Sequence, residues 1–347
     1  MTLSNPKVLV LGGGIAGLTA ALALARLDIG VDLLEKTSTL GGKVRDFCCK
    51  AIDVCQQCGA CLLNDSLAGL TREPSIKVHL ETELRKFKKE QKDFLYYFSG
   101  PEGAGEGRAQ ALLVATGFNP FRAEDKPQYR YGILPDVVTG LDLERQIKET
   151  GIILKPSDQT PPKSIAFIQC VGSRDLHLGH PFCSQVCCGY ALRMAKLIKY
   201  KNPETEITVF YMDIQTFGKD FPLFMDEARH QIRLVRAIPG EIQRGEEGKL
   251  LLSFQKEEGT ASEKQAFDLA VLSIGLMPNP DNIALSRMLG ISLTTDGFLS
   301  GRQEQAPLPQ GIFLAGTVQG PKSIARTMSQ SYRVVEELTA HLRAVFK

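Results

Sequence analysis

A glycine-rich turn near the start of the chain is the feature that most constrains the fold. Residues 7–11 form an apolar run typical of a strand buried on both faces, and the pattern Gly12-x-Gly14-x-x-Gly17 follows directly. An alanine- and leucine-rich helix is predicted next, and a second strand then ends at Glu35. This order of strand, glycine turn, helix, strand and acid is typical of a βαβ unit that binds a dinucleotide.

Each residue type in this turn has a physical role in such a unit. Gly12 permits the tight turn, Gly14 lets the backbone approach a pyrophosphate, and Gly17 allows the helix to pack closely on the strand. The helix N-terminus offers free N–H groups and the positive end of its dipole to the phosphates. Glu35 can accept hydrogen bonds from ribose hydroxyls and disfavours a 2′-phosphate.

Three later segments favour FAD over NAD as the dinucleotide. Residues 41–43 (Gly-Gly-Lys), 115–117 (Ala-Thr-Gly) and 311–317 resemble recurring motifs of the two-domain flavoproteins, a family that includes thioredoxin and glutathione reductases. Gly316-Thr317 stands where that family often has Gly-Asp, so the individual contact of Thr317 stays open.

The last predicted helix opens near Ser323. Its N-terminus, aimed at the N1/O2 edge of a flavin, would stabilise negative charge on the reduced ring; the alternative is a helix that is merely capped by Ser323. The residues predicted to contact FAD are Gly12, Gly14, Ile15, Ala16, Gly17, Glu35, Lys36, Gly42, Lys43, Ala115, Thr116, Gly117, Gly316, Thr317, Lys322, Ser323 and Ile324.

The predicted fold class is α/β, with the two dinucleotide-binding-type domains of thioredoxin and glutathione reductases. A Rossmann-type FAD domain comprises residues 1–157 and 272–347, and a smaller α/β domain, residues 158–271, is inserted into it. Residues 45–64 are predicted to form an irregular, cysteine-rich excursion, and residues 101–107 a flexible hairpin loop.

The inserted domain lacks a second glycine fingerprint. Its first strand, 165–168, runs into Gln169-Cys170-Val171-Gly172-Ser173, so a nicotinamide cofactor has no obvious binding site. Electrons are therefore expected to enter or leave by another route.

Composition excludes several classes of function. The net charge is only +2, without the basic excess of nucleic-acid-binding proteins, and the longest apolar stretch, 15–25, is too short to span a membrane. The nine cysteines are odd in number and clustered, which does not indicate a secreted disulfide framework. The apolar N-terminal segment imitates a signal peptide, but the glycine spacing explains it better, so we expect a cytoplasmic protein.

Four of the cysteines, Cys170, Cys183, Cys187 and Cys188, form what we name the second thiol group. They are expected at a strand end and a helix start, where a helix dipole favours thiolates. Four thiolates suit a [4Fe–4S] cubane, which redox chemistry beside a flavin favours, but also suit zinc, and unmetallated thiols are a third possibility.

The phrase Cys170-Val-Gly-Ser-Arg-Asp, followed by Cys183, Cys187 and Cys188, resembles the flavin-proximal cluster motif of HdrA, the flavoprotein component of heterodisulfide reductase. The resemblance extends from the Gly12 turn through Ser323, and implies that these four cysteines ligate a [4Fe–4S] cluster. Methanogen members of the family carry extra ferredoxin modules, and no complete ferredoxin cysteine run exists here. The chain is most similar to the compact HdrA-like subunit of sulfur-oxidising (sHdr) complexes.

That resemblance implies HdrB-like and HdrC-like partner subunits, a lipoate-binding protein that works with the complex, and a homodimeric core. From the charge balance and the short apolar stretches, we expect neither nucleic acid nor a membrane as a partner. The expected function is electron transfer between flavin, cluster and partner subunits in cytoplasmic sulfur oxidation. Whether the flavin bifurcates electrons stays open, although the missing ferredoxin modules argue against bifurcation.

The remaining cysteines, Cys48, Cys49, Cys55, Cys58 and Cys61, form the first thiol group. Its spacing begins like a ferredoxin run but lacks the fourth cysteine. It could bind a second cluster, act as a redox dithiol, or consist of structural or partner-facing thiols. Two rival functions follow: an FAD-dependent dithiol–disulfide oxidoreductase that uses a pair among Cys55, Cys58 and Cys61, and a zinc-stapled FAD-binding scaffold.

Overall fold

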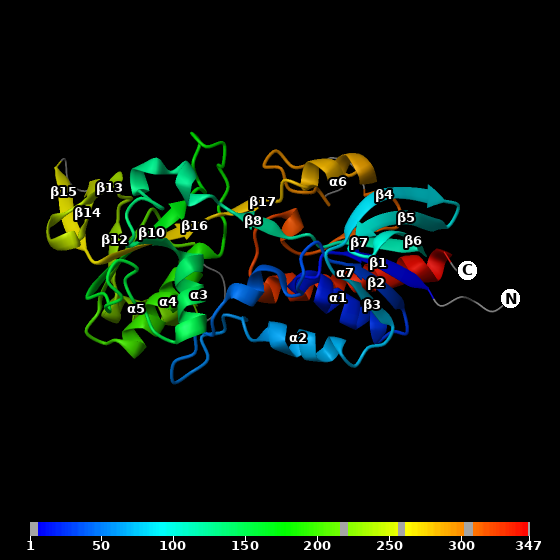
Figure 1. The fold of residues 1–347 in the computed structure, drawn as a ribbon, viewed down its shortest axis with the longest axis horizontal. Helices are drawn as coiled ribbons and strands as arrows, with labels where there is room; N and C mark the ends of the chain where they lie inside the picture. The colour runs from blue at the N-terminus through cyan, green and yellow to red at the C-terminus, as the bar shows by residue number, and fades with distance from the viewer. Residues whose placement is uncertain (1–5, 216–220, 256–260, 302–307, 346–347) are drawn as a thin grey trace. The chain divides into compact units, whose positions relative to one another are not determined.

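The computed structural model describes residues 6–215, 221–255, 261–301 and 308–345. The chain divides into two compact units, which are considered separately (Figure 1). Unit 1 comprises Met1–Arg45, Gly59–Asn119 and Met277–Lys347, and unit 2 comprises Asp46–Cys58 and Pro120–Leu276. Among the described helices, none has the length and apolar character needed to cross a lipid bilayer.

Unit 1 is built on a five-stranded parallel sheet in the order β18-β7-β1-β2-β3. Its central strands are almost entirely buried apolar residues, as expected for a parallel sheet that is covered on both faces. The strands are β1 (Lys7–Leu11), β2 (Gly30–Leu34), β3 (Ile76–His79), β7 (Ala111–Val114) and β18 (Ile312–Leu314).

Helices and a second sheet cover this parallel sheet. Helix α1 (Ile15–Ala25) is buried nearly all round and packs against α7 (Ile324–Val345) and α2 (Leu62–Leu70). A three-stranded antiparallel sheet contributes Phe94 and Tyr96 to a core shared with the parallel strands. It is formed by β4 (Glu83–Glu90), β5 (Asp93–Gly100) and β6 (Gly103–Ala109).

The flexible loop predicted for residues 101–107 is wrong, because most of this segment is strand β6. A Cβ at Gly105 would lie 2.5 Å from the Phe98 ring, and one at Gly107 would lie 2.3 Å from Tyr96. The glycines therefore leave room for two aromatic rings of the paired strand β5.

Unit 2 also has a five-stranded parallel sheet, in the order β12-β11-β10-β16-β9. Three helices share an apolar core with it: α3 (Gly140–Thr150), α4 (Cys187–Lys201) and α5 (Phe221–Gln231). Its strands are β9 (Val137–Thr139), β10 (Ser164–Val171), β11 (Glu206–Tyr211), β12 (Arg233–Arg236) and β16 (Leu269–Ile274).

The remaining elements are short. An antiparallel sheet of β13 (Glu241–Arg244), β14 (Leu250–Gln255) and β15 (Ser262–Phe267) completes unit 2, and its Phe254 and Phe267 rings pack on Phe210 of β11. The others are β8 (Phe118–Pro120), β17 (Leu276–Pro278), α6 (Asn282–Leu289), and the 3₁₀ turns η1 (Gly42–Asp46), η2 (Ala123–Asp125), η3 (Pro127–Tyr129), η4 (Glu246–Gly248) and η5 (Gly316–Gln319).

The boundaries of the units differ from the predicted domains. The first lies between Asn119 and Pro120 instead of at 157/158, because β9 pairs with β16 and α3 packs on the same sheet. The second lies between Leu276 and Met277, close to the predicted 271/272. Residues 46–58 of the cysteine-rich excursion also belong to unit 2.

Candidate functional site

The glycine turn of unit 1 joins β1 to α1, and two of its glycines are required by packing. Gly12 has φ +101°, and a Cβ there would lie 2.5 Å from the Ala115 carbonyl oxygen. A Cβ at Gly17 would lie 1.9 Å from the Gly12 carbonyl oxygen, so helix and turn approach each other as the fingerprint predicts.

Gly14 differs from its neighbours because space is open beside it. Its φ is −76°, and the nearest atom to a Cβ placed there is the Gly42 Cα, 3.9 Å away. Gly14 is also the N-cap of α1, where no side chain caps the helix. An open cradle next to a helix N-terminus fits a pyrophosphate.

Glu35 follows β2 and its carboxylate is held by the protein. Oε2 accepts a 2.7 Å hydrogen bond from the Gly13 N–H, and Oε1 accepts bonds from the N–H and hydroxyl of Thr37 at 2.8 and 2.7 Å. A carboxylate can accept about four hydrogen bonds, so capacity for a ribose hydroxyl remains. The side chain is thus oriented and buried at the edge where an adenosine ribose is expected.

Two of the later predicted segments lie against the same turn. The Gly41 N–H donates to the Gly13 carbonyl at 2.8 Å, and a Cβ on Gly42 would lie 3.1 Å from the Gly14 Cα. A Cβ on Gly316 would lie 2.7 Å from the Ala16 Cβ. Lys43 is exposed in the turn η1.

The Ala115–Gly117 and Gly316–Thr317 segments also meet. Ala115 follows β7 and is buried, and a Cβ on Gly117 would have the Thr317 hydroxyl as its nearest neighbour, at 3.9 Å. The Thr116 hydroxyl is buried with no hydrogen-bond partner among the described residues. Unit 1 therefore brings together the predicted FAD segments at residues 12–17, 41–42, 115–117 and 316–317, with Glu35 beside them.

Lys322 crosses the turn that precedes α7. Its ammonium donates to the Gly316 carbonyl at 2.6 Å and to the Gly320 carbonyl at 3.1 Å. Burial, and secondarily the charge of Arg326, lowers the pKa of Lys322 to about 8. Ser323 caps α7: its hydroxyl accepts from the Arg326 N–H at 3.3 Å, while its carbonyl accepts from the Thr327 N–H at 2.8 Å.

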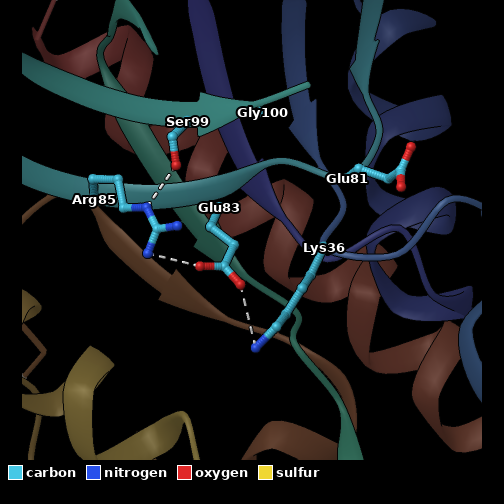
Figure 2. A pocket seen from close by; sticks show the side chains of 6 residues that line it. All are labelled: Lys36, Glu81, Glu83, Arg85, Ser99 and Gly100. Carbon is cyan, nitrogen blue, oxygen red and sulfur yellow. Dashed lines mark hydrogen bonds and ion pairs between the residues drawn. The ribbon is translucent and has the colours of Figure 1, made fainter. Parts of the chain in front are cut away.

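Lys36 is the predicted FAD residue whose side chain is engaged elsewhere. Its ammonium lies 3.0 Å from an Asp281 oxygen and 3.4 Å from a Glu83 oxygen, and the hydrogen bond with Asp281 raises the pKa of Lys36. Figure 2 shows it in an open pocket where Glu83 also pairs with Arg85, which donates to Ser99. A side-chain contact with FAD would have to compete with these carboxylates.

The second thiol group gathers in unit 2 at the carboxyl end of β10. Cys170 lies in β10, Cys183 in the following loop, and Cys187 and Cys188 open α4. All are buried except the half-buried Cys183, which accepts a 3.3 Å hydrogen bond from the Gln185 N–H. In a dinucleotide-binding sheet this strand end carries the glycine loop, so thiols occupy the place of the missing fingerprint.

Cys170 lies in a bulge of β10. The pairing of β10 with β16 shifts register between Ile168 and Val171, and Cys170 has φ +59°, an uncommon conformation for a residue other than glycine. Such outliers persist where the surrounding structure holds them in place.

The four thiols influence one another electrostatically. Burial, with smaller contributions from Cys188 and Cys183, raises the pKa of Cys170 to about 12 against the lowering effect of Arg174. Burial also raises the pKa of Cys187, followed by the effects of Cys188, Cys170 and Cys183. Metal coordination would instead lower the pKa of these thiols, because a coordinating thiol is deprotonated.

Four neighbouring thiols suit two kinds of metal group. Within the described ranges, no three or more His, Cys, Asp or Glu side chains are arranged to hold a single metal ion. The four largely buried thiols supply the ligand number of a [4Fe–4S] cluster, and four thiolates also suit zinc.

The first thiol group is divided by its surroundings. Cys48 is buried, and burial followed by the charge of Glu144 raises the pKa of its thiol to about 12. Cys58 is half-buried, whereas Cys49, Cys55 and Cys61 are exposed.

A buried ion pair fixes the Cys48 segment to α3. Lys50 pairs with Glu144, whose other oxygen accepts a 2.7 Å hydrogen bond from the Cys48 N–H. Both side chains are at most 4% exposed. Sequence reasoning missed this pair because the two residues lie far apart in the chain; an acid among the apolar positions of the predicted helix was the only signal.

We expect Glu144→Gln to lower the free energy of unfolding by roughly 3–5 kcal/mol, because it leaves the Lys50 charge buried and unpaired. Urea unfolding of the metal-free protein measures this. The matched control is Arg145→Gln, which breaks the partly exposed 3.0 Å ion pair with Asp46 between the same two segments. It should lower the free energy of unfolding by about 1 kcal/mol or less. Equal losses in the two variants would contradict the assignment.

Comparisons with known proteins agree with this architecture. Residues 10–51 match the family model of an NAD(P)-binding Rossmann-like domain. The chain resembles thioredoxin reductases of T. acidophilum (TM-score 0.62, 16% identity, 97% of this chain and 98% of that one) and Lactococcus lactis (TM-score 0.63, 16% identity, 98% and 100%). The predicted α/β fold with two dinucleotide-binding-type domains is confirmed.

Two curated relatives, both HdrA proteins, align with nearly the whole chain. One is the HdrA component of the H(2):CoB-CoM heterodisulfide,ferredoxin reductase of Methanothermobacter marburgensis, 31% identical over 94% of this chain. The other is the iron-sulfur HdrA component, numbered 2 in its name, of the CoB--CoM heterodisulfide reductase of Methanopyrus kandleri. It is 29% identical over 93% of this chain. The chain spans 62% of the length of each relative. The second alignment has 413 positions against 347 residues here, so that relative contains inserted residues.

Proposed function

This chain is an HdrA-like protein, homologous to the HdrA component of heterodisulfide reductases over most of its length, and from this premise we propose that it is an electron-transfer subunit containing FAD and a [4Fe–4S] cluster. It acts as an oxidoreductase component of a heterodisulfide-reductase-like complex. The observation that carries the proposal is the gathering of four cysteines at the carboxyl end of β10, where a second dinucleotide site would have its glycine loop.

The residues of unit 1 bind and orient the flavin cofactor in this proposal. The Gly14 cradle and the N-terminus of α1 hold the pyrophosphate, and Glu35 holds the ribose. The N-terminus of α7 stabilises negative charge near the ring. When bound, FAD supplies one- and two-electron chemistry and the cluster supplies one-electron transfer. The cluster ligands are Cys170, Cys183, Cys187 and Cys188.

We assign the complex to cytoplasmic sulfur oxidation, with HdrB-like and HdrC-like partner subunits, a lipoate-binding protein as a further partner, and a homodimeric core. The support is the resemblance of the chain to the compact HdrA-like subunits. Size-exclusion chromatography with light scattering tests the dimer, and co-purification of tagged protein tests the partner subunits.

Analysis of iron, acid-labile sulfide and flavin in anaerobically purified protein tests the proposal. About four iron atoms per chain support one cubane, and about eight would add a cluster at the first thiol group. Zinc without iron would support a zinc-stapled scaffold instead. A reductive titration then gives the order of the one-electron flavin potentials; crossed potentials would indicate bifurcation, against our expectation.

A dithiol–disulfide oxidoreductase is the second candidate, because thiols of the first group are accessible. Cys55 and Cys61 are exposed and Cys58 is half-buried. A Cβ on Gly59 would lie 3.2 Å from the Ile324 Cβ, so the segment between Cys58 and Cys61 adjoins a predicted flavin contact. Flavin without iron, together with reduction of a small disulfide that is lost in Cys58→Ser, would favour this candidate.

We expect NADH or NADPH alone to reduce the bound flavin slowly or not at all. In unit 2 the end of β10 carries Cys170 and the turn after it carries Gly172, where a Cβ would lie 2.0 Å from the Phe121 ring. This turn is not the open, glycine-rich cradle that a nicotinamide dinucleotide needs. Stopped-flow absorbance under argon measures the rate, with dithionite as the positive control. Rapid stoichiometric bleaching would contradict this prediction.

FAD affinity should fall as the pH rises above about 8. The pKa of Lys322 is lowered to about 8 by burial, and an anionic cofactor nearby would raise it, so binding favours the protonated side chain. Titration calorimetry of the apoprotein with FAD between pH 7 and 9.5 measures the slope. Lys322→Gln should bind more weakly at pH 7 and show a flatter profile; an unchanged slope would remove Lys322 from the site.

A further inference from the structure

Three buried polar side chains beside Cys170 lack hydrogen-bond partners. The hydroxyls of Ser173 and Ser273 and both amide atoms of Gln169 are unpartnered among the described residues. Each of these side chains belongs to a residue that is at most 2% exposed.

All three residues are placed around the bulge that carries Cys170. Gln169 directly precedes the cysteine, and the Ser173 N–H donates to the Cys170 carbonyl at 3.3 Å. Ser273 lies on β16 opposite the bulge, because Ile168 pairs with Leu272 and Val171 pairs with Ile274. The residues that carry the unpartnered atoms thus lie on β10, on the turn after it and on β16, next to the bulge.

Buried polar atoms in proteins are nearly always paired, because an unpaired one destabilises the fold. The same region satisfies other groups: the Ser184 hydroxyl, also fully buried, accepts a 2.9 Å hydrogen bond from the Leu276 N–H. Either a bound group or buried water therefore completes the hydrogen bonds of these side chains.

We propose that Gln169, Ser173 and Ser273 donate hydrogen bonds to sulfur atoms of the cluster held by the second thiol group, and thereby raise its reduction potential. This inference rests on the proposed function. The Gln169 amide nitrogen and the two hydroxyls are donors, and cluster sulfides and thiolates are acceptors. Reduction adds negative charge to the cluster, so donated hydrogen bonds stabilise the reduced form more than the oxidised form. The three residues hydrogen-bond the cluster sulfurs and do not ligate its iron.

The test compares Gln169→Leu, Ser173→Ala and Ser273→Ala in the full chain, purified anaerobically. The matched control is Ser253→Ala on β14, since the Ser253 hydroxyl is also unpartnered among the described residues of unit 2 but is remote in sequence and sheet from Cys170. Iron content and an EPR-monitored redox titration are the readouts. We expect the midpoint reduction potential of the cluster to be about 59 mV more negative in Ser273→Ala. At the potential that half-reduces the wild-type cluster, the reduced-to-oxidised ratio of this variant would then be about tenfold lower.

A second readout uses the metal-free protein. Removing a hydroxyl that has no protein partner should leave the apoprotein Tm unchanged or raise it. Ser173→Ala and Ser273→Ala should therefore destabilise only the cluster-loaded protein. A lower apoprotein Tm with an unchanged cluster potential would overturn the inference, because the hydroxyl would then have a structural partner.

The remaining outcomes separate this inference from the proposed function. If the wild type contains no iron, both fall. If the wild type and all variants contain about four iron atoms with equal potentials, the hydrogen bonds go to water and only this inference falls.

Discussion

Replacing Gly14 with valine yields a folded protein that is colourless or poor in flavin. Gly14 has an extended conformation (φ −76°, ψ −178°) that valine adopts readily, and a Cβ there meets no atom nearer than 3.9 Å. The added side chain instead fills the cradle proposed for the pyrophosphate. We expect FAD affinity to fall by about a hundredfold or more, ~2.7 kcal/mol, with little change in the apoprotein Tm.

Two other glycine variants serve as controls for this result. Gly240→Val adds the same side chain where no atom lies within 4 Å of the new Cβ, so it should keep both fold and flavin. Gly12→Ala places a Cβ 2.5 Å from the Ala115 carbonyl oxygen and should damage the fold itself. Flavin absorbance per chain and thermal unfolding separate the three cases. Normal flavin occupancy in Gly14→Val would remove the turn from the FAD site.

Cys187→Ser and Cys188→Ser should lose most of their iron and keep their FAD. Both residues open α4 in unit 2, whereas the glycine turn lies in unit 1. Serine offers an oxygen in place of sulfur, and iron–sulfur cubanes are held by thiolates. We expect iron to fall from about four atoms per chain to under about one, with the flavin ratio unchanged.

The matched controls are Cys58→Ser and Cys61→Ser, which alter thiols of the first group that are half-buried and exposed. They should retain cluster iron. Iron, sulfide and flavin are measured for all four variants in parallel. Iron that persists in both α4 variants but disappears in Cys58→Ser would move the metal to the first thiol group.

The sequence was sufficient to predict the fold class because the decisive patterns are local. The Gly12 turn, its preceding apolar strand and the terminal acid Glu35 all lie within one βαβ unit. The first domain boundary was missed because β9 is a three-residue strand whose partner, β16, lies more than a hundred residues away. Strand β6 was missed because its glycines match a loop pattern, while the aromatic rings that require them belong to β5.

The candidate sites show the same division between local and distant signals. Cysteine spacing marked the second thiol group, and the structure brings its members together at one strand end. No spacing rule could link Lys50 with Glu144 or Cys170 with Ser273, because those relations arise from helix and sheet packing. The ion pairs of Lys36 depend on Asp281, which is likewise remote in sequence.

The glycines of β6 have a consequence for how the unit 1 sheet tolerates mutation. Gly107 leaves room for Tyr96, whose hydroxyl donates a hydrogen bond to Asp32 in the middle of β2, the strand that ends just before Glu35. A single methyl group at position 107 would push the ring and disturb this link. A change at Gly107 in β6 would therefore reach, through Tyr96 of β5, the strand that precedes Glu35, the residue proposed to bind the ribose.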